Sequence, residues 1–203
     1  MNKSKTSVFA RWQSGLLAAV TMGMLSFPVT AEEKNQEVNL RAAEALIDAF
    51  YSFDSTKLQA ALAFAKSSIP FIGFYQSWAQ GGNYKIITRM PCENKEPSLV
   101  NCSITVRDDL MLALGIDFNV TDTFHVTFSD GKIVSVKTTS NDLPVFNDAM
   151  EWVNKEQPEL VQEPCRGFFE GGPTPGACVR AMVEGYRRFV ASDKFPEKYK
   201  NKK

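Results

Sequence analysis

The sequence predicts an α+β fold in which N-terminal helices pack against an antiparallel sheet and further helices follow the sheet. Apolar residues recur at spacings of three and four in the first part of the chain, which is typical of amphipathic helices. They then alternate with polar residues through the middle of the chain, as in half-buried strands. Helical spacing returns in the last third, so the order of elements is helices, strands and helices.

The first residues have the character of a secretory leader. A basic stretch with Lys3 and Arg11 precedes an uncharged apolar run, residues 16–27, and the small residue Ala31 follows. This order predicts a cleavable signal peptide over residues 1–31. The alternative is a membrane anchor, but the run has only about a dozen residues and a spanning helix needs about 20.

Three helices are expected after the leader. Residues 37–53 form an amphipathic pattern that places Leu46, Ile47 and Phe50 on one face. Asp54, Ser55 and Thr56 interrupt this pattern and supply N-caps for a second, short helix that carries Leu58 and Leu62. A third helix is expected from Pro70 to Trp78, ended by Gly81-Gly82.

Four strands are expected in the middle of the chain, over residues 84–90, 99–106, 118–128 and 132–139. The polar stretch Asn94–Pro97 is the expected turn between the first two strands. Asp130-Gly131 is a strong hairpin signal between the last two strands. Residues 108–115 fit neither pattern clearly and are consistent with a helical turn.

The C-terminal part is expected to be helical, with an irregular segment inside it. Asp142 is the expected N-cap of a helix from Leu143 to about Gln157, which Pro158 ends. A last helix can start at Thr174-Pro175, and residues 195–203 are the expected frayed basic tail. Residues 32–163 therefore form one predicted domain, and residues 164–203 add a loop, a helix and the tail.

The four cysteines lie in the predicted mature chain, and an even number in an exported protein favours disulfides. Four cysteines allow three connectivities. We expect Cys92 to pair with Cys102 and Cys165 with Cys178, because each pair brackets a short, turn-rich segment. A zinc site needs closer pairs than these, so no metal is expected.

Strand alternation identifies the candidate site residues. In all four strands the even-numbered residues are the more apolar set, so we expect the even face to pack on the helices. His125 then falls on the outer face, which favours a surface or interface histidine over a general base. Asp108, Asp122 and Tyr84 have the inward parity. A carboxyl group in an apolar pocket can have a raised pKa and act as an acid or a base.

Charge and motifs exclude several classes of function. The formal net charge is zero, with 23 basic and 23 acidic residues, and no basic stripe indicates a nucleic-acid partner. The sequence holds no phosphate-binding loop, nucleophile elbow or metal-ligand helix motif, so no cofactor is expected. No second apolar run of spanning length follows the leader, so we expect a soluble mature protein with no membrane partner.

The arrangement resembles the nuclear transport factor 2-like superfamily, in its SnoaL-like branch. The resemblance rests on the leading helices, the hairpin from Thr123 to Ile133 that contains Asp130-Gly131, and a helix with Trp152 followed by Pro158-Glu159; it spans residues 37–160. It implies a curved, cone-like sheet over the helices with an apolar pocket, and dimers through the sheet. Members include ketosteroid isomerases, polyketide cyclases, dehydratases and epoxide hydrolases, and also domains without activity.

Two functions follow as hypotheses. The first is an exported domain that binds a small apolar ligand or a protein partner without catalysis, because the inner strand faces hold few acid or base groups. The alternative is a cofactor-free lyase or isomerase with Asp122 or Asp108 as the base and Tyr84 as the acid. In addition, the outer face with Arg89, Arg107, His125 and Lys137 is a candidate homodimer interface.

Overall fold

The computed structural model describes residues 31–167 and 176–200, and within them the chain is an α+β fold with an open antiparallel sheet of five strands. The helices are α1 (Ala31–Tyr51), α2 (Ser55–Ala61), α3 (Ile69–Gly81), α4 (Asp109–Ala113), α5 (Pro144–Glu156), α6 (Pro158–Val161), α7 (Gly176–Ala191) and α8 (Glu197–Lys200), with a short 3-10 helix, η1 (Lys66–Ser68), before α3. The strands are β1 (Lys85–Arg89), β2 (Glu93–Glu96), β3 (Leu99–Arg107), β4 (Val120–Ser129) and β5 (Lys132–Ser140).

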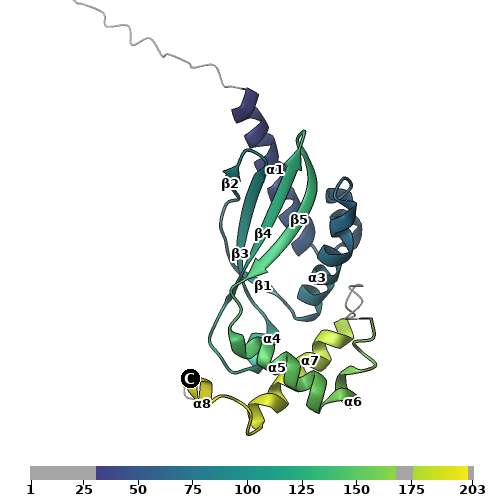
Figure 1. Ribbon diagram of the computed structural model, residues 1–203, viewed down its shortest axis with the longest axis vertical. Helices are drawn as coiled ribbons and strands as arrows, with labels where there is room; N and C mark the ends of the chain where they lie inside the picture. Colours follow the sequence, from purple (N-terminus) through teal and green to yellow (C-terminus); the bar gives the residue numbers. More distant parts are fainter. Residues whose placement is uncertain (1–30, 168–175, 201–203) are drawn as a thin grey trace, which may run out of the picture.

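The molecule is elongated, with the sheet and α1–α3 in one half and α4–α8 in the other (Figure 1). The predicted signal peptide, residues 1–31, lies outside the described residues except for Ala31, with which α1 begins. Along the described ranges, no helix combines the length and the apolar character that a membrane span needs.

Strands β3 and β4 form the centre of the sheet. Strand β5 pairs with β4 at one edge, whereas β1 and β2 share the other edge and pair with different ends of β3. Asp130 and Gly131 join β4 to β5 with φ angles of 49° and 70°. Two positive φ angles define a type I′ turn, which an Asp-Gly pair favours. The predicted hairpin at this position is confirmed.

Strand β2 corrects the predicted turn over Asn94–Pro97. Residues Glu93–Glu96 pair with β3 instead, with Glu93 opposite Asn101. The disulfide between Cys92 and Cys102 joins the residue before β2 to β3, with Cα atoms 4.3 Å apart. This link holds the segment against β3, so a polar sequence that reads as a turn continues the sheet edge.

The two central strands follow the predicted alternation. Their even-numbered residues are buried and the residues between them are partly exposed, apart from Ser129, which is exposed at the end of β4. Strand β3 buries Val100, Cys102, Ile104 and Val106, and strand β4 buries Val120, Asp122, Phe124, Val126 and Phe128. The inner face of these strands is therefore the apolar one, as the sequence predicts.

The two outer strands depart from the prediction. On β5, Ile133 is buried whereas Val134 is exposed, because the pairing with β4 shifts by one residue between Thr127 and Phe128. On β1, Ile86 pairs with the buried Val106 but is 42% exposed at the edge of the sheet, and the pairing with β3 shifts after it. A bulge inserts one residue into a strand and moves the following side chains to the other face.

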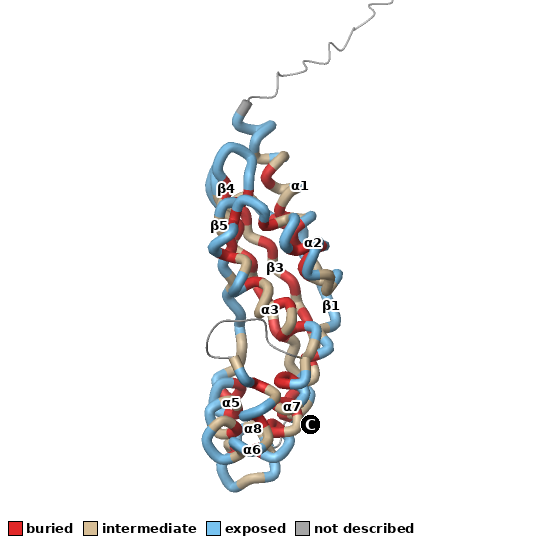
Figure 2. The backbone as a smooth tube through the Cα atoms, turned by 90° about the vertical axis from the view of Figure 1, so that its right-hand side faces the viewer, coloured by how far each residue is buried: buried red, intermediate tan, exposed pale blue. Residues whose placement is uncertain are grey.

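Helices α1, α2 and α3 cover the inner face of the sheet. Leu46, Ile47 and Phe50 of α1 are fully buried, and the Phe50 ring lies 4.9 Å from the Phe124 ring of β4. Figure 2 shows buried residues along α1 and β3, and a second group among α5 and α7. Buried residues therefore gather beneath the sheet and among the later helices, and both groups belong to one connected core.

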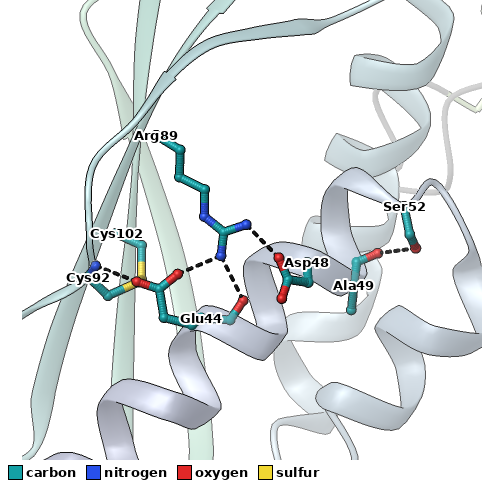
Figure 3. A network of polar contacts seen from close by, with 7 residues as sticks. All are labelled: Glu44, Asp48, Ala49, Ser52, Arg89, Cys92 and Cys102. Carbon is teal, nitrogen blue, oxygen red and sulfur yellow. Dashed lines mark hydrogen bonds and ion pairs between the residues drawn. A yellow bond between two sulfur atoms is a disulfide. The ribbon is translucent and has the colours of Figure 1, made fainter.

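A polar network fastens α1 to the sheet edge (Figure 3). The Arg89 guanidinium donates to Asp48 Oδ1 and to Glu44 Oε2, both at 2.5 Å. The other Glu44 oxygen accepts from the backbone N–H of Cys92 at 2.6 Å, beside the Cys92–Cys102 disulfide. The network thus fixes the edge strand on the helix at the place where the chain passes from β1 to β2.

Helix α7 is the centre of the other half and lies against α3, α4, α5 and α6. A Cβ atom at Gly185 would lie 2.5 Å from Val153 Cγ2, so only glycine permits this close approach of α5 and α7. The disulfide between Cys165 and Cys178 joins α7 to the segment after α6. The structure thus contains both of the disulfide pairs that the sequence predicts.

The end of the chain differs from the predicted frayed tail. Phe195 is 3% exposed and its ring lies 5.7 Å from that of Phe189 on α7, and residues Glu197–Lys200 form α8. The apolar side chain of Phe195 therefore fixes the segment that the basic composition suggested was loose. The predicted helix start at Thr174-Pro175 lies outside the described residues, which resume with α7 at Gly176.

Candidate functional site

A cleft of about 210 Å³ lies at the end of β5, between α3 and the start of α5. Its described lining is mostly aromatic, with the side chains of Phe71, Phe74, Tyr75, Trp78, Tyr84 and Phe146. The remaining lining residues are Thr138, Thr139, Ser140, Asp142 and Met150. A mostly apolar hollow with a few polar groups is the usual form of a small-molecule site.

The sequence of α3 explains the aromatic wall. Phe71, Phe74, Tyr75 and Trp78 follow the spacing that brings residues onto one face of a helix. The rings of Phe74 and Trp78 stack with centroids 6.4 Å apart and planes inclined by 26°. Trp78 is buried whereas Phe71 is 51% exposed, so the wall runs from the core to the surface.

Asp122 lies behind this wall. It faces inward from β4, where its register partners are Ile104 and Ser140, and it is 1% exposed. Burial raises the pKa of its carboxyl group to about 7, and the nearby hydroxyl groups of Tyr75 and Tyr51 oppose this rise. A carboxyl pKa raised toward neutrality is the condition for general acid or base chemistry.

The tyrosines around Asp122 keep their protons. Burial is the main cause that raises the pKa values of the Tyr51, Tyr75 and Tyr84 hydroxyl groups, and the charge of Asp122 adds to it at each one. The rings of Tyr75 and Tyr84 meet edge to face at 6.4 Å. Tyr75 and Tyr84 also line the cleft, so these two hydroxyl-bearing residues both border the cleft and lie near Asp122.

Asp108 has a structural explanation. Its Oδ1 accepts from the backbone N–H groups of Leu110 and Met111, both at 2.9 Å, and so caps α4. Burial raises its pKa to about 6, and the two capping hydrogen bonds oppose that rise. Its other oxygen, Oδ2, is buried and accepts no hydrogen bond from the described part of the chain. The turn-capping role therefore accounts for most of what Asp108 does.

Asp142 corrects another prediction. Leu143 is the N-cap residue of α5, and Pro144 occupies the first turn, so Asp142 does not cap the helix. Its carboxyl group accepts a hydrogen bond from Ser140 Oγ and lines the cleft. Burial is the main cause that raises its pKa. Sequence reasoning gave this residue only a structural role, because an Asp before a helix usually is its cap.

The three carboxyl groups act on one another. The charge of Asp142 raises the pKa values of both Asp122 and Asp108, and the charge of Asp108 raises that of Asp122. Burial remains the larger cause for each of them. This end of the sheet is therefore a region of negative potential whenever the carboxyl groups are ionised.

The outer face of the sheet holds His125, as the sequence predicts. Its ring nitrogens lie 3.0 Å from Asn101 Oδ1 and 2.9 Å from Thr139 Oγ1. On the same face Ser103 and Thr123 share a hydrogen bond of 3.1 Å across β3 and β4. These polar contacts between strands give His125 a structural role. The homodimer through this face stays a prediction.

Tyr84 lines the cleft, Asp122 is buried close enough to Tyr84 for its charge to act on the hydroxyl group, and Asp108 caps α4. Sequence reasoning missed Tyr51, Tyr75 and Asp142, although the helical spacing already put Tyr75 on the face of Trp78. Within the described ranges, no cluster of histidine, cysteine and acidic side chains has the form of a metal site. No family model, curated protein or solved structure matches the chain.

Proposed function

We propose that this chain is an exported domain that holds a small, largely apolar ligand in its aromatic cleft without changing it chemically. The single observation that carries this proposal is the cleft itself, with six aromatic side chains among its described lining residues. Removal of aromatic and apolar surface from water supplies the binding energy, at about 25 cal/mol per Å². At about 210 Å³ the cleft is smaller than typical drug-sized sites, so the ligand is small or protrudes.

Export is part of the proposal. The basic and apolar leader over residues 1–31 supports it, and so do the two disulfides, which are typical of oxidising compartments outside the cytosol. The proposed location is the periplasm or the external medium.

We also propose membership of the SnoaL-like branch of the nuclear transport factor 2-like superfamily. The support is that three helices precede the sheet, that Asp130-Gly131 joins β4 to β5, and that a helix with Trp152 follows the sheet. The aromatic cleft between sheet and helices supports the same assignment. A shared fold does not define a reaction, so the ligand has to come from the site itself.

The ligand-binding proposal is tested with phenylnaphthylamine, a neutral probe whose fluorescence rises in an apolar site. We expect saturable binding to the wild-type protein. The Phe71→Ala variant should bind on the order of fivefold more weakly, because it removes one aromatic wall of the cleft. Phe71 is 51% exposed, so this substitution should disturb the fold little.

Phe64→Ala is the matched control. Phe64 is 64% exposed, does not line the cleft, and lies under the Lys132 ammonium group at 4.6 Å. We expect its affinity for the probe to stay within roughly twofold of the wild type. Absence of saturable binding, or an equal loss in both variants, would show that the cleft is not the binding site.

A second candidate function is acid–base catalysis by a cofactor-free lyase or isomerase. The observation that favours it is the Asp122 carboxyl group, whose pKa is raised to about 7 behind Tyr75 and Tyr84. In this alternative Asp122 receives a proton through one of the two hydroxyl groups, because it is itself 1% exposed. The substrate would be a carbonyl compound with an acidic neighbouring C–H bond.

Solvent hydrogen exchange tests this second candidate. We expect the wild-type protein to accelerate deuterium incorporation next to the carbonyl of cyclohexenone, and Asp122→Asn to lose on the order of a hundredfold of that rate. The rate is followed by NMR, with Asp148→Asn, an exposed substitution on α5, as the control. Exchange that is no faster than in buffer, or that survives in Asp122→Asn, removes this alternative.

A further inference from the structure

The described lining residues of the cleft carry a negative formal charge and no positive one. Asp142 is the charged residue of the described lining at neutral pH, and no lysine, arginine or histidine is among those lining residues. Asp142 accepts a hydrogen bond from Ser140 Oγ and forms no ion pair with any of the described residues. A ligand that enters the cleft therefore meets an uncompensated carboxylate.

Two further carboxyl groups extend this field behind the wall. Asp122 and Asp108 are each 1% exposed, and each is close enough to Asp142 for the charges to interact. One oxygen of each, Oδ2, is buried without a hydrogen-bond partner among the residues that the structure describes. A positive charge in the cleft would favour the ionised form of all three groups and so gain energy from each of them.

The aromatic walls favour the same kind of charge. The face of an aromatic ring is the negative end of its quadrupole and attracts ammonium groups, most strongly with tryptophan. Trp78 and Phe74 stack along the helix, and Tyr75 and Tyr84 meet edge to face beside them. Aromatic rings and a carboxylate that line the same cleft supply the two kinds of attraction that hold an alkylated ammonium ion.

We infer that the ligand of the cleft is a small organic cation, an ammonium group that carries alkyl substituents, which the aromatic rings enclose and Asp142 neutralises. This inference rests on the proposed ligand-binding function and narrows it to one chemical class. An anionic ligand is disfavoured by the same carboxyl groups. A neutral apolar ligand would gain the ring contacts but none of the charge interaction.

The experiment compares choline with dimethylbutanol, its uncharged carbon isostere. The two molecules have nearly the same shape, so the difference between their affinities measures the charge alone. We expect choline to bind the intact, disulfide-bonded protein about tenfold more tightly at physiological ionic strength. Binding is measured by NMR titration at a slightly alkaline pH, which favours the ionised form of the carboxyl groups.

Asp142→Asn should reduce the preference for choline to roughly twofold or less, because it removes the charge that faces the ligand and keeps the shape. Asp148→Asn is the matched control, since Asp148 is exposed on α5 and does not line the cleft. It removes the same formal charge from the protein. A preference that falls equally in both variants would point to net charge and overturn the assignment to the cleft.

The outcomes separate this inference from the function on which it rests. Equal affinities for choline and dimethylbutanol would overturn the inference and leave the apolar ligand site standing, as would saturable binding of phenylnaphthylamine with no binding of choline. If none of the three probes binds, the proposed function fails together with the inference.

Discussion

Replacing Asp122 with asparagine should make the protein more stable above neutral pH and should flatten the pH dependence of its unfolding. The cause is the cost of keeping an ionised carboxyl group in the core beneath the sheet. Burial raises the pKa of Asp122 from 3.8 to about 7. A shift of about three units corresponds to on the order of 4 kcal/mol of free energy of unfolding.

The sign follows from proton binding in the two states. Below about pH 4 the carboxyl group is protonated in both the folded and the unfolded chain. Between about pH 4 and pH 7 the unfolded chain loses this proton while the folded chain keeps it, so a rising pH favours unfolding. Above a pH of about 7 the folded group also ionises, and no further stability is lost.

The measurement is urea unfolding of the wild type and of Asp122→Asn at about pH 4 and about pH 8. The free energies of unfolding of the two proteins should differ little at about pH 4. At about pH 8 the variant should have the higher free energy of unfolding. Asp148→Asn, an exposed carboxyl group on α5, is the control and should run parallel to the wild type. A variant that is less stable than the wild type at the higher pH would show that ionised Asp122 is stabilised in the fold.

Truncating Phe124 should give the largest loss of stability that we expect from one substitution. Its side chain is fully buried on β4, with its ring 4.9 Å from that of Phe50 and 6.2 Å from that of Tyr75. Phe124→Ala removes buried apolar surface and leaves a cavity between the sheet and two helices. Such substitutions cost about 3–5 kcal/mol of unfolding free energy.

Urea unfolding with both disulfides intact measures this loss. Phe64→Ala is again the control, since Phe64 is 64% exposed and should cost less than about 1 kcal/mol. Phenylnaphthylamine binding should weaken as well in Phe124→Ala, because Tyr75 packs on Phe124 from the cleft side. A loss below about 1 kcal/mol for Phe124→Ala would mean that the core under β4 is packed loosely.

The central part of the fold could be predicted from the sequence because local patterns and tertiary packing agree there. Strands β3 and β4 have neighbours on both sides and helices on one face, so period-two alternation decides which residues are buried. At the edge strands a bulge changes that assignment, as Ile133 and Val134 show. A bulge depends on the pairing register between strands, which the sequence of one strand does not contain.

The candidate site could also be predicted from the sequence only in part. Inward parity identifies Asp122, and the burial of its carboxyl group follows from that parity. Parity does not reveal which groups meet Asp122, because Tyr51 and Tyr75 belong to helices far from it in the sequence. The sequence also suggests a helix cap for Asp142, whereas the structure places it in the cleft.

By itself the sequence determines the α+β order of elements and the inward side of the central strands, and it favours the observed cysteine pairs, because each of these predictions rests on spacing along the chain. Only the tertiary structure decides that an aromatic face of α3, the end of β5 and Asp142 enclose one cleft in front of Asp122. The reason is physical: spacing along the chain specifies the face of an element, and packing between elements specifies which faces meet.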